Sequence, residues 1–220
     1  MSRERGQERG GRLEKFFNLR AEKQEHIIDA AFTIFGKNGY KKASIADIAE
    51  QAGIAKGMVL YYFGSKKNLY LYLAELCKKV IMEEMEKGAD ESVTDFFDRI
   101  KMMTDTKIAA MKRYPAVFSF VTSIYYETDE EVREDVQKFM EDSISIRESW
   151  VFSKTDTSKF KDDIDPRLIE KFLVWAGEGF ASSLPFNGDM HQLNAFTEEF
   201  YQCLNVMKKY FYKEEEKNEL

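Results

Sequence analysis

Apolar residues in this 220-residue chain recur every three or four positions over most of its length, which is the spacing of one face of an α-helix. Proline and glycine are scarce, and no strand pattern is visible. The sequence therefore predicts an all-α protein. Beyond an N-terminal domain, helices are expected over residues 66–87, 93–113, 115–127 and 130–152, with two more after Pro166 and a polar loop over 154–163.

The segment from Ser44 to Phe63 carries the most specific pattern. Ser44 is a good N-cap, because its hydroxyl accepts a hydrogen bond from a free amide of the first helical turn, and Asp47 adds negative charge where the helix dipole favours it. Gly53 suits the left-handed conformation of a sharp turn. A short helix, a glycine turn and a second short helix are the layout of a helix-turn-helix DNA reader.

The second short helix, from about Ala55 to Tyr62, is expected to bury Val59 and Phe63 together with Ile54 of the turn. Its opposite face then holds a cation, a glycine, flexible apolar side chains and two phenols, which suits base edges and phosphates. The residues of this face are Lys56, Gly57, Met58, Leu60, Tyr61 and Tyr62.

A longer helix is predicted directly after this reader. Ser65 caps it, and Lys66 and Lys67 occupy its first turn, where the helix dipole disfavours a cation. A phosphate partner would offset that cost, so Lys66 is a candidate DNA contact. In the alternative interpretation both lysines are solvated surface charges.

Residues 20 to 70 resemble the N-terminal domain of the TetR family of bacterial transcriptional regulators. The matching text is IIDAAFTIFGKNGYKKASIADIAEQAGIAKG, followed by LYYF, SK and NL. A preceding helix with a Gly39-Tyr40 exit, the capped helix, the glycine turn and the Ser-Lys exit are all in register. The remainder of the chain resembles the family by architecture.

The resemblance implies DNA contacts at the positions that commonly touch DNA in this family. Leu60 departs from the family pattern, which most often has an aromatic residue there, so Tyr61 or Tyr62 is expected to supply the phenol. Ala46 lies where some members use a longer polar side chain, and base reading from the first helix is expected to be poor. The implied contacts are Ser44, Lys56, Gly57, Met58, Tyr61, Tyr62 and Lys66.

Charge divides the chain into a basic head and an acidic body. Residues 1–67 contain 13 Lys and Arg against 8 Asp and Glu, and the remaining residues contain 20 against 31. The net charge of −6 therefore does not argue against nucleic acid, because the field of the DNA-facing surface is the relevant one.

The first 19 residues are rich in arginine and glycine. They are interpreted either as an arm that enters an adjacent minor groove or as a disordered tail. Phe16, Phe17 and Leu19 are too apolar for a free tail and are expected to pack on the head or extend its first helix. The predicted domains are a flexible basic arm over 1–19, a helix-turn-helix domain over 20–66, an effector-binding and dimerisation domain over 67–212 and a charged tail over 213–220.

The body contains many large, soft side chains, and ordinary core packing explains any single one of them. As a set they also fit a cavity for a small apolar or amphipathic effector, and the resemblance implies one in this region. The candidate pocket residues are Phe97, Met103, Phe118, Tyr125 and Trp150.

The last two helices are the candidate dimer interface. Each carries an apolar stripe, and a protein that reads paired half-sites must be two-fold symmetric. The alternative is that both stripes pack within one subunit, whereas in the resembling family these helices form a four-helix bundle between subunits. The candidate interface residues are Phe172, Trp175, Gly179, Phe196, Phe200, Leu204 and Met207.

The sequence shows few features that would indicate an enzyme. His26 and His191 have no carboxylate or cysteine at metal-ligand spacing, so we expect no metal, no cofactor and no catalytic residue. Cys77 and Cys203 are expected to be buried thiols rather than a disulfide. Without a long apolar run or a signal-peptide core, the protein is expected to be cytoplasmic and not in a membrane.

The resulting hypothesis is a homodimeric, sequence-specific regulator that binds a palindromic operator in double-stranded DNA, most simply a repressor released by a small effector. Two alternatives stay open. One is an activator of the same family, and the other is an all-helical dimeric protein that binds a protein partner.

Overall fold

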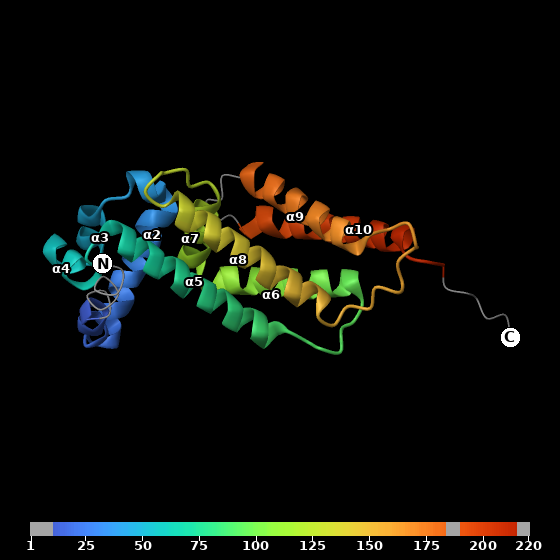
Figure 1. Cartoon of the computed structure of the whole chain (residues 1–220), viewed down its shortest axis with the longest axis horizontal. Helices are drawn as coiled ribbons and strands as arrows, with labels where there is room; N and C mark the ends of the chain where they lie inside the picture. The colour runs from blue at the N-terminus through green and yellow to red at the C-terminus, as the bar shows by residue number, and fades with distance from the viewer. Residues whose placement is uncertain (1–10, 184–189, 215–220) are drawn as a thin grey trace. The chain divides into compact units, whose positions relative to one another are not determined.

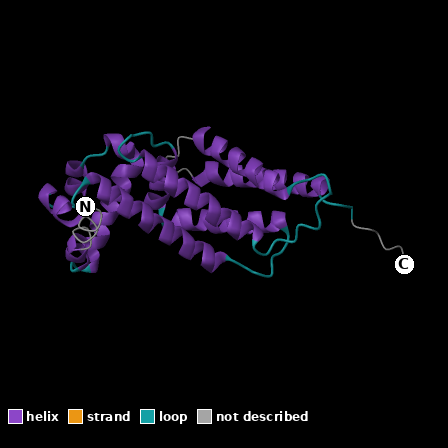
Figure 2. Ribbon diagram, in the orientation of Figure 1, coloured by secondary structure: helices purple, strands orange, loops and turns teal. Residues whose placement is uncertain are grey.

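The computed structural model describes residues 11–183 and 190–214, and this part of the chain is built from α-helices joined by loops (Figures 1 and 2). The prediction of an all-α fold is confirmed. A short N-terminal helix covers residues 11–17. The helices that follow are α2 (Ala21–Lys42), α3 (Ile45–Gln51), α4 (Lys56–Phe63), α5 (Lys66–Gly88), α6 (Phe96–Arg113), α7 (Pro115–Tyr125), α8 (Arg133–Phe152), α9 (Pro166–Ser183) and α10 (Met190–Phe211).

The predicted helix boundaries agree with the structure to within a few residues, and local chemistry sets them. Pro115 and Pro166 each occupy the first position of a helix, where a missing N–H costs nothing. The α7–α8 connection is longer than predicted, because the Glu127 carboxylate accepts hydrogen bonds from the amides of Thr128 and Asp129 and holds a turn. Pro185 and Gly188 favour an end to the helix that begins at Pro166, and both lie outside the described residues.

None of the described helices combines the length and the apolar composition that crossing a lipid bilayer requires.

The chain divides into two compact units. Unit 1 comprises Met1–Glu84 and Ala109–Ser145, and unit 2 comprises Met85–Ile108 and Ile146–Leu220. Helices α5, α6 and α8 contribute residues to both units. The functional boundary predicted between residues 66 and 67 lies inside unit 1, where Leu69 and Tyr70 of α5 share a core with α2.

The core of unit 1 is a cluster of aromatic rings. Phe35 of α2 lies edge-on to Tyr70 and Phe120, with ring centroids 5.1 and 6.2 Å apart. Helices α2 and α7 approach closely at Gly36, where a Cβ would lie 2.7 Å from Ser119 Oγ, so only glycine allows this packing without a shift. The helix-turn-helix segment is thus built on a rigid, tightly packed support.

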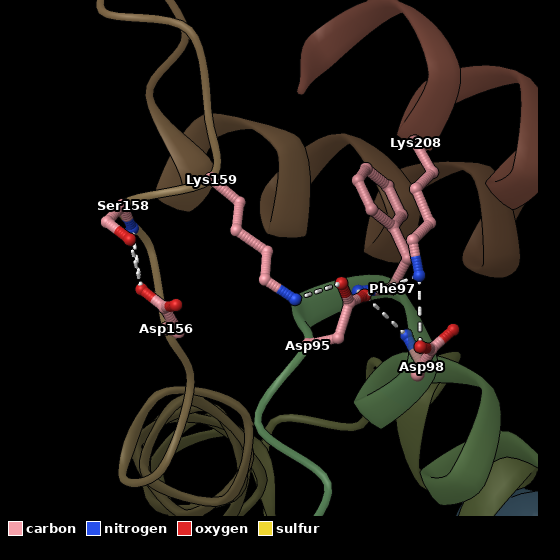
Figure 3. A network of polar contacts seen from close by, with 7 residues as sticks. All are labelled: Asp95, Phe97, Asp98, Asp156, Ser158, Lys159 and Lys208. Atoms are coloured by element: carbon pink, nitrogen blue, oxygen red, sulfur yellow. Dashed lines mark hydrogen bonds and ion pairs between the residues drawn. The ribbon is translucent and has the colours of Figure 1, made fainter. Parts of the chain in front are cut away.

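Unit 2 combines an aromatic core with a charged network at the start of α6 (Figure 3). Asp95 caps α6 by accepting from the amides of Phe97 and Asp98 at 3.1 and 3.2 Å. Its carboxylate also pairs with Lys159, at 3.2 Å, and with Lys208 of α10, at 3.0 Å. Burial alone would raise the pKa of Asp95, but hydrogen bonds from Lys208, the Asp98 amide and Lys159 hold that pKa below its ordinary value.

Candidate nucleic-acid interface

The helix-turn-helix is held by the local devices that the sequence predicts. Ser44 Oγ accepts a hydrogen bond from the Asp47 amide at 3.1 Å and begins α3. Gly53 has φ +65°, and the chain turns there before α4. Ile48 of α3 and Val59 of α4 are fully buried, so the two helices are fixed to one core. The orientation of α4 is therefore set by its packing on this core.

The exposed face of α4 contains Lys56, Gly57 and Tyr61. Tyr61 is 48% exposed, and nothing lies within 4 Å of the position a Gly57 Cβ would take. Met58 and Leu60 are half-buried and pack against the edge of the core. The surface thus presents a cation, an open backbone and a phenol, which is a set able to contact phosphates and base edges.

Tyr62 differs from the expectation that it faces DNA. It is 3% exposed, and its ring packs edge-on against Phe16, with centroids 6.0 Å apart. The reason is helical geometry, because Val59, Tyr62 and Phe63 occupy one face at spacings of three and four. Of the two phenols predicted for the DNA-facing side, only Tyr61 is exposed.

The two lysines at the start of α5 have different surroundings. Lys67 Nζ lies 2.8 Å from Asp135 and donates to the Glu131 carbonyl at 2.6 Å, so its charge is paired within unit 1. Lys66 Nζ lies 4.4 Å from the centroid of the Tyr40 ring and pairs with no carboxylate in the part of the chain that the structure describes. The two neighbours could not be distinguished in the sequence. In the structure Glu131 of the α7–α8 connection and Asp135 of the first turn of α8 pair with Lys67 alone.

The N-terminal helix is ordered and docked, in keeping with the expectation for Phe16. That ring is buried against Tyr62, Phe63 and Tyr72. The arm predicted over residues 1–19 is therefore helical from residue 11 to residue 17, and residues 1–10 lie outside the described part of the chain.

The candidate pocket residues belong to both units. Phe97 and Met103 pack in the core of unit 2, where the Trp150 carbonyl also accepts a hydrogen bond from Arg99 at 2.6 Å. Phe118 and Tyr125 belong to α7 in unit 1, the former buried and the latter partly exposed. Their role in effector binding stays a prediction.

The candidate dimer residues fall into two groups. On α9, Phe172 and Trp175 are 52% and 65% exposed, and Gly179 is also exposed. On α10, Leu204 is buried in the core of unit 2, which leaves almost none of its side chain for a partner. Phe200 and Met207 pack against the same core, and the half-buried Phe196 ring stacks on Phe200. Among the α10 side chains that the structure describes, the large exposed apolar ones are instead Val206 and Tyr210. Cys203, expected to be a buried thiol, is also exposed, whereas Cys77 is buried as expected.

Sequence reasoning missed a buried ion pair between α8 and α9. Arg147 Nε donates to Glu170 Oε1 at 2.7 Å, and Glu170 is buried. The signal in the sequence was weak, because Glu170 is one of two carboxylates on a largely apolar helix.

Comparison with known proteins identifies the helix-turn-helix. Residues 27–73 match the TetR_N profile, described as "Bacterial regulatory proteins, tetR family". Residues 27–73 are a TetR-family DNA-binding domain. The chain is therefore a DNA-binding transcriptional regulator, and this domain is the reason to regard it as a regulator and not as an enzyme.

One relative of this chain is the negative transcriptional regulator IcaR of the biofilm operon icaADBC from Staphylococcus aureus. The two are 24% identical over 203 residues, which cover 84% of this chain and 99% of IcaR.

Solved structures show the same fold. A TetR-family regulator from Chloroflexus aurantiacus superposes with a TM-score of 0.71 at 24% identity, covering 91% of this chain and 98% of that one. FadR from Bacillus subtilis, solved in complex with stearoyl-CoA, gives a TM-score of 0.64 at 18% identity, covering 82% and 96%.

Proposed function

We propose that this chain is a homodimeric repressor that binds a palindromic operator through α4 of each subunit and leaves it when a small apolar or amphipathic effector binds. The observation that carries the proposal is the exposed face of α4, where Lys56, Gly57 and Tyr61 are accessible on a helix whose other residues are buried or half-buried. Such a repressor acts in the bacterial cytoplasm, where the DNA lies.

Each exposed residue has a part in the proposed interface. Lys56 and Lys66 supply cations for phosphates, while Met58 and Tyr61 reach base edges in the major groove. The remaining contacts come from Ser44 at the start of α3, the backbone at Gly57 and the exposed part of Leu60. Tyr62 is left out, because its ring is buried.

The proposed dimer uses the apolar face of α9. Leu168, Phe172 and Trp175 are exposed at spacings of four and three, so they form one stripe along the helix. Large exposed aromatic residues in a stripe mark a surface that another protein covers. A two-fold dimer would place two copies of α4 in successive major grooves, about 34–36 Å apart.

Repression and effector release are supported by the relatives. IcaR is named as a negative regulator, and FadR was solved with stearoyl-CoA, an amphipathic molecule. A long-chain acyl-CoA is therefore the first effector class to test. A coupling of about 1–3 kcal/mol between effector and operator would weaken DNA binding by about 5- to 150-fold.

The test measures binding by fluorescence anisotropy on the DNA upstream of the chain's own gene and on random duplexes. The Lys56→Ala/Tyr61→Ala variant should lose at least about tenfold in operator affinity, since each contact to a base or phosphate contributes on the order of 1 kcal/mol. The control Lys138→Ala/Tyr126→Ala removes an exposed lysine and an exposed tyrosine from elsewhere in unit 1 and should change nothing.

Effector release is measured on the same complex. Stearoyl-CoA should release the operator, and coenzyme A without the acyl chain should not. If the wild-type protein binds neither the upstream DNA nor any selected duplex, the proposed function is wrong.

A further inference from the structure

The N-terminal helix, residues 11–17, precedes the segment that matches the family profile, which starts at residue 27. It is nevertheless fixed to the DNA-reading segment. The Phe16 ring lies 5.0 Å from the Phe63 ring and 6.0 Å from the Tyr62 ring, both at the C-terminal end of α4. Leu13, one turn earlier, packs against the same core. The helix is thus anchored by its apolar face directly beside the reader.

This anchoring places two cations next to the exposed end of α4. Lys15 Nζ lies 4.4 Å from the centroid of the Tyr61 ring, and Arg12 Nη1 lies 3.5 Å from the Leu60 carbonyl oxygen. Both side chains are exposed, and Tyr61 is itself the phenol of the proposed DNA-facing surface. A duplex that reaches Tyr61 therefore comes close to both cations.

The two charges have no carboxylate partner in the part of the chain that the structure describes. Neither Arg12 nor Lys15 forms an ion pair with a carboxylate in residues 11–183 or 190–214, in contrast to Lys67, which Asp135 holds at 2.8 Å. Cations three positions apart on a helix repel each other, so the pair weakens the free helix slightly. The negative dipole end of α4 attracts Arg12 and the face of the Tyr61 ring attracts Lys15, but neither contact neutralises the charge. A phosphate would satisfy both.

We infer that the N-terminal helix is a second phosphate-binding part of the DNA interface, with Arg12 and Lys15 contacting the DNA backbone beside the groove that α4 enters. The inference rests on the proposed function of α4. These contacts carry no base information, so they add affinity and fix the position of the reader equally on every sequence.

The experiment compares the full-length wild-type protein with Arg12→Gln/Lys15→Gln on the operator and on a random duplex, at several salt concentrations. Loss of two phosphate contacts should lower the slope of log K against log[salt] by about 1.8 and weaken binding about 10- to 30-fold near physiological salt on both duplexes. The matched control is Lys112→Gln/Lys138→Gln, which removes two exposed lysines of α6 and α8 and should leave the slope unchanged.

A second variant separates docking from charge. Phe16→Ala removes the anchor while keeping both cations, and it should reproduce part of the decrease in the slope of log K against log[salt]. Circular dichroism confirms that this variant is folded.

An unchanged slope in Arg12→Gln/Lys15→Gln, while wild type binds its operator, overturns this inference and leaves the proposed function intact. A loss confined to the operator would also overturn it, because it would indicate base reading. If wild type binds no DNA, the proposed function fails first.

Discussion

Unit 1 and unit 2 both bury aromatic rings, but they differ in where they keep their charges. The buried charged side chains of the described residues, Asp95, Arg99 and Glu170, all belong to unit 2. Unit 1 buries no charged side chain among those residues. Buried tyrosine hydroxyls without a hydrogen-bond partner occur in both units, at Tyr40 and Tyr70 in unit 1 and at Tyr212 in unit 2.

The difference reflects what each unit has to hold in place. Unit 1 keeps its cations outside, where phosphates can reach them, and its rings provide a rigid support for α4. Unit 2 uses charge to join chain segments: Arg99 donates to the carbonyls of Val93, Trp150 and Val151 and so ties the end of α8 to the chain before α6. The stability that aromatic packing contributes does not change with pH. The stability that a capped and paired carboxylate contributes is lost when the carboxylate is protonated.

Phe35→Ala should give the largest loss of stability. Phe35 is fully buried among Tyr40, Tyr70 and Phe120, and removing it from this ring cluster should cost about 3–5 kcal/mol through lost burial and the cavity left behind. Urea unfolding followed by far-UV circular dichroism measures the cost. The control Phe17→Ala, at an exposed ring, should cost far less. A loss below about 1 kcal/mol for Phe35→Ala would show that the ring cluster does not support unit 1.

Asp95→Asn should cost less, about 1–3 kcal/mol, because it leaves Lys159 and Lys208 without their shared carboxylate. Trp150 and Trp175, the chain's two tryptophans, both belong to unit 2, so their fluorescence at fixed protein concentration reports its unfolding. The exposed pair of Asp162 with Lys213 supplies the control, and Asp162→Asn should have no measurable effect.

The contribution of Asp95 should depend on pH with a definite sign. Its folded pKa lies below its unfolded value of about 3.9, so the stabilisation is complete well above that pH and is lost as the pH falls through the folded value. The difference between wild type and Asp95→Asn should therefore shrink below about pH 4. A difference that stays constant down to pH 2 would contradict the ionic account of unit 2.

Tyr70→Phe should have the smallest effect. Burial raises the pKa of Tyr70 far above its ordinary value, and its hydroxyl has no partner among the described residues. Removing that hydroxyl should leave stability unchanged or raise it by up to about 1 kcal/mol. Tyr201→Phe is the comparison, because the Tyr201 hydroxyl donates to Asp105 in unit 2 and its loss should be destabilising. Equal losses for the two variants would remove the distinction between the units.

The local features of the DNA-reading segment could be predicted from the sequence, because each depends on residues a few positions apart. The Ser44 cap, the left-handed Gly53 and the start of helices at Pro115 and Pro166 are confirmed. The orientation of Tyr62 could not be predicted in the same way. Residues 58 to 63 are all apolar or aromatic, so periodicity does not identify the inward face of α4.

The same limit applies to α10. Leu204 and Val206 lie on different faces of this helix, and only the core of unit 2, to which α6 and α9 also contribute, shows that Leu204 is the buried one. The docking of residues 11–17 also depends on partners more than forty positions away. The sequence shows which side chains are apolar, but it does not show which part of the folded chain covers each of them.

The sequence by itself determined the family, the helices and the position of the reader, because capping, turn chemistry and hydrophobic period act over a single helical turn. The tertiary structure alone decided which cations remain free. It pairs Lys67 with Asp135 and leaves Lys66, Arg12 and Lys15 without a carboxylate among the described residues. Ion pairing depends on distances of a few ångströms between segments far apart in sequence, and only the folded chain sets those distances.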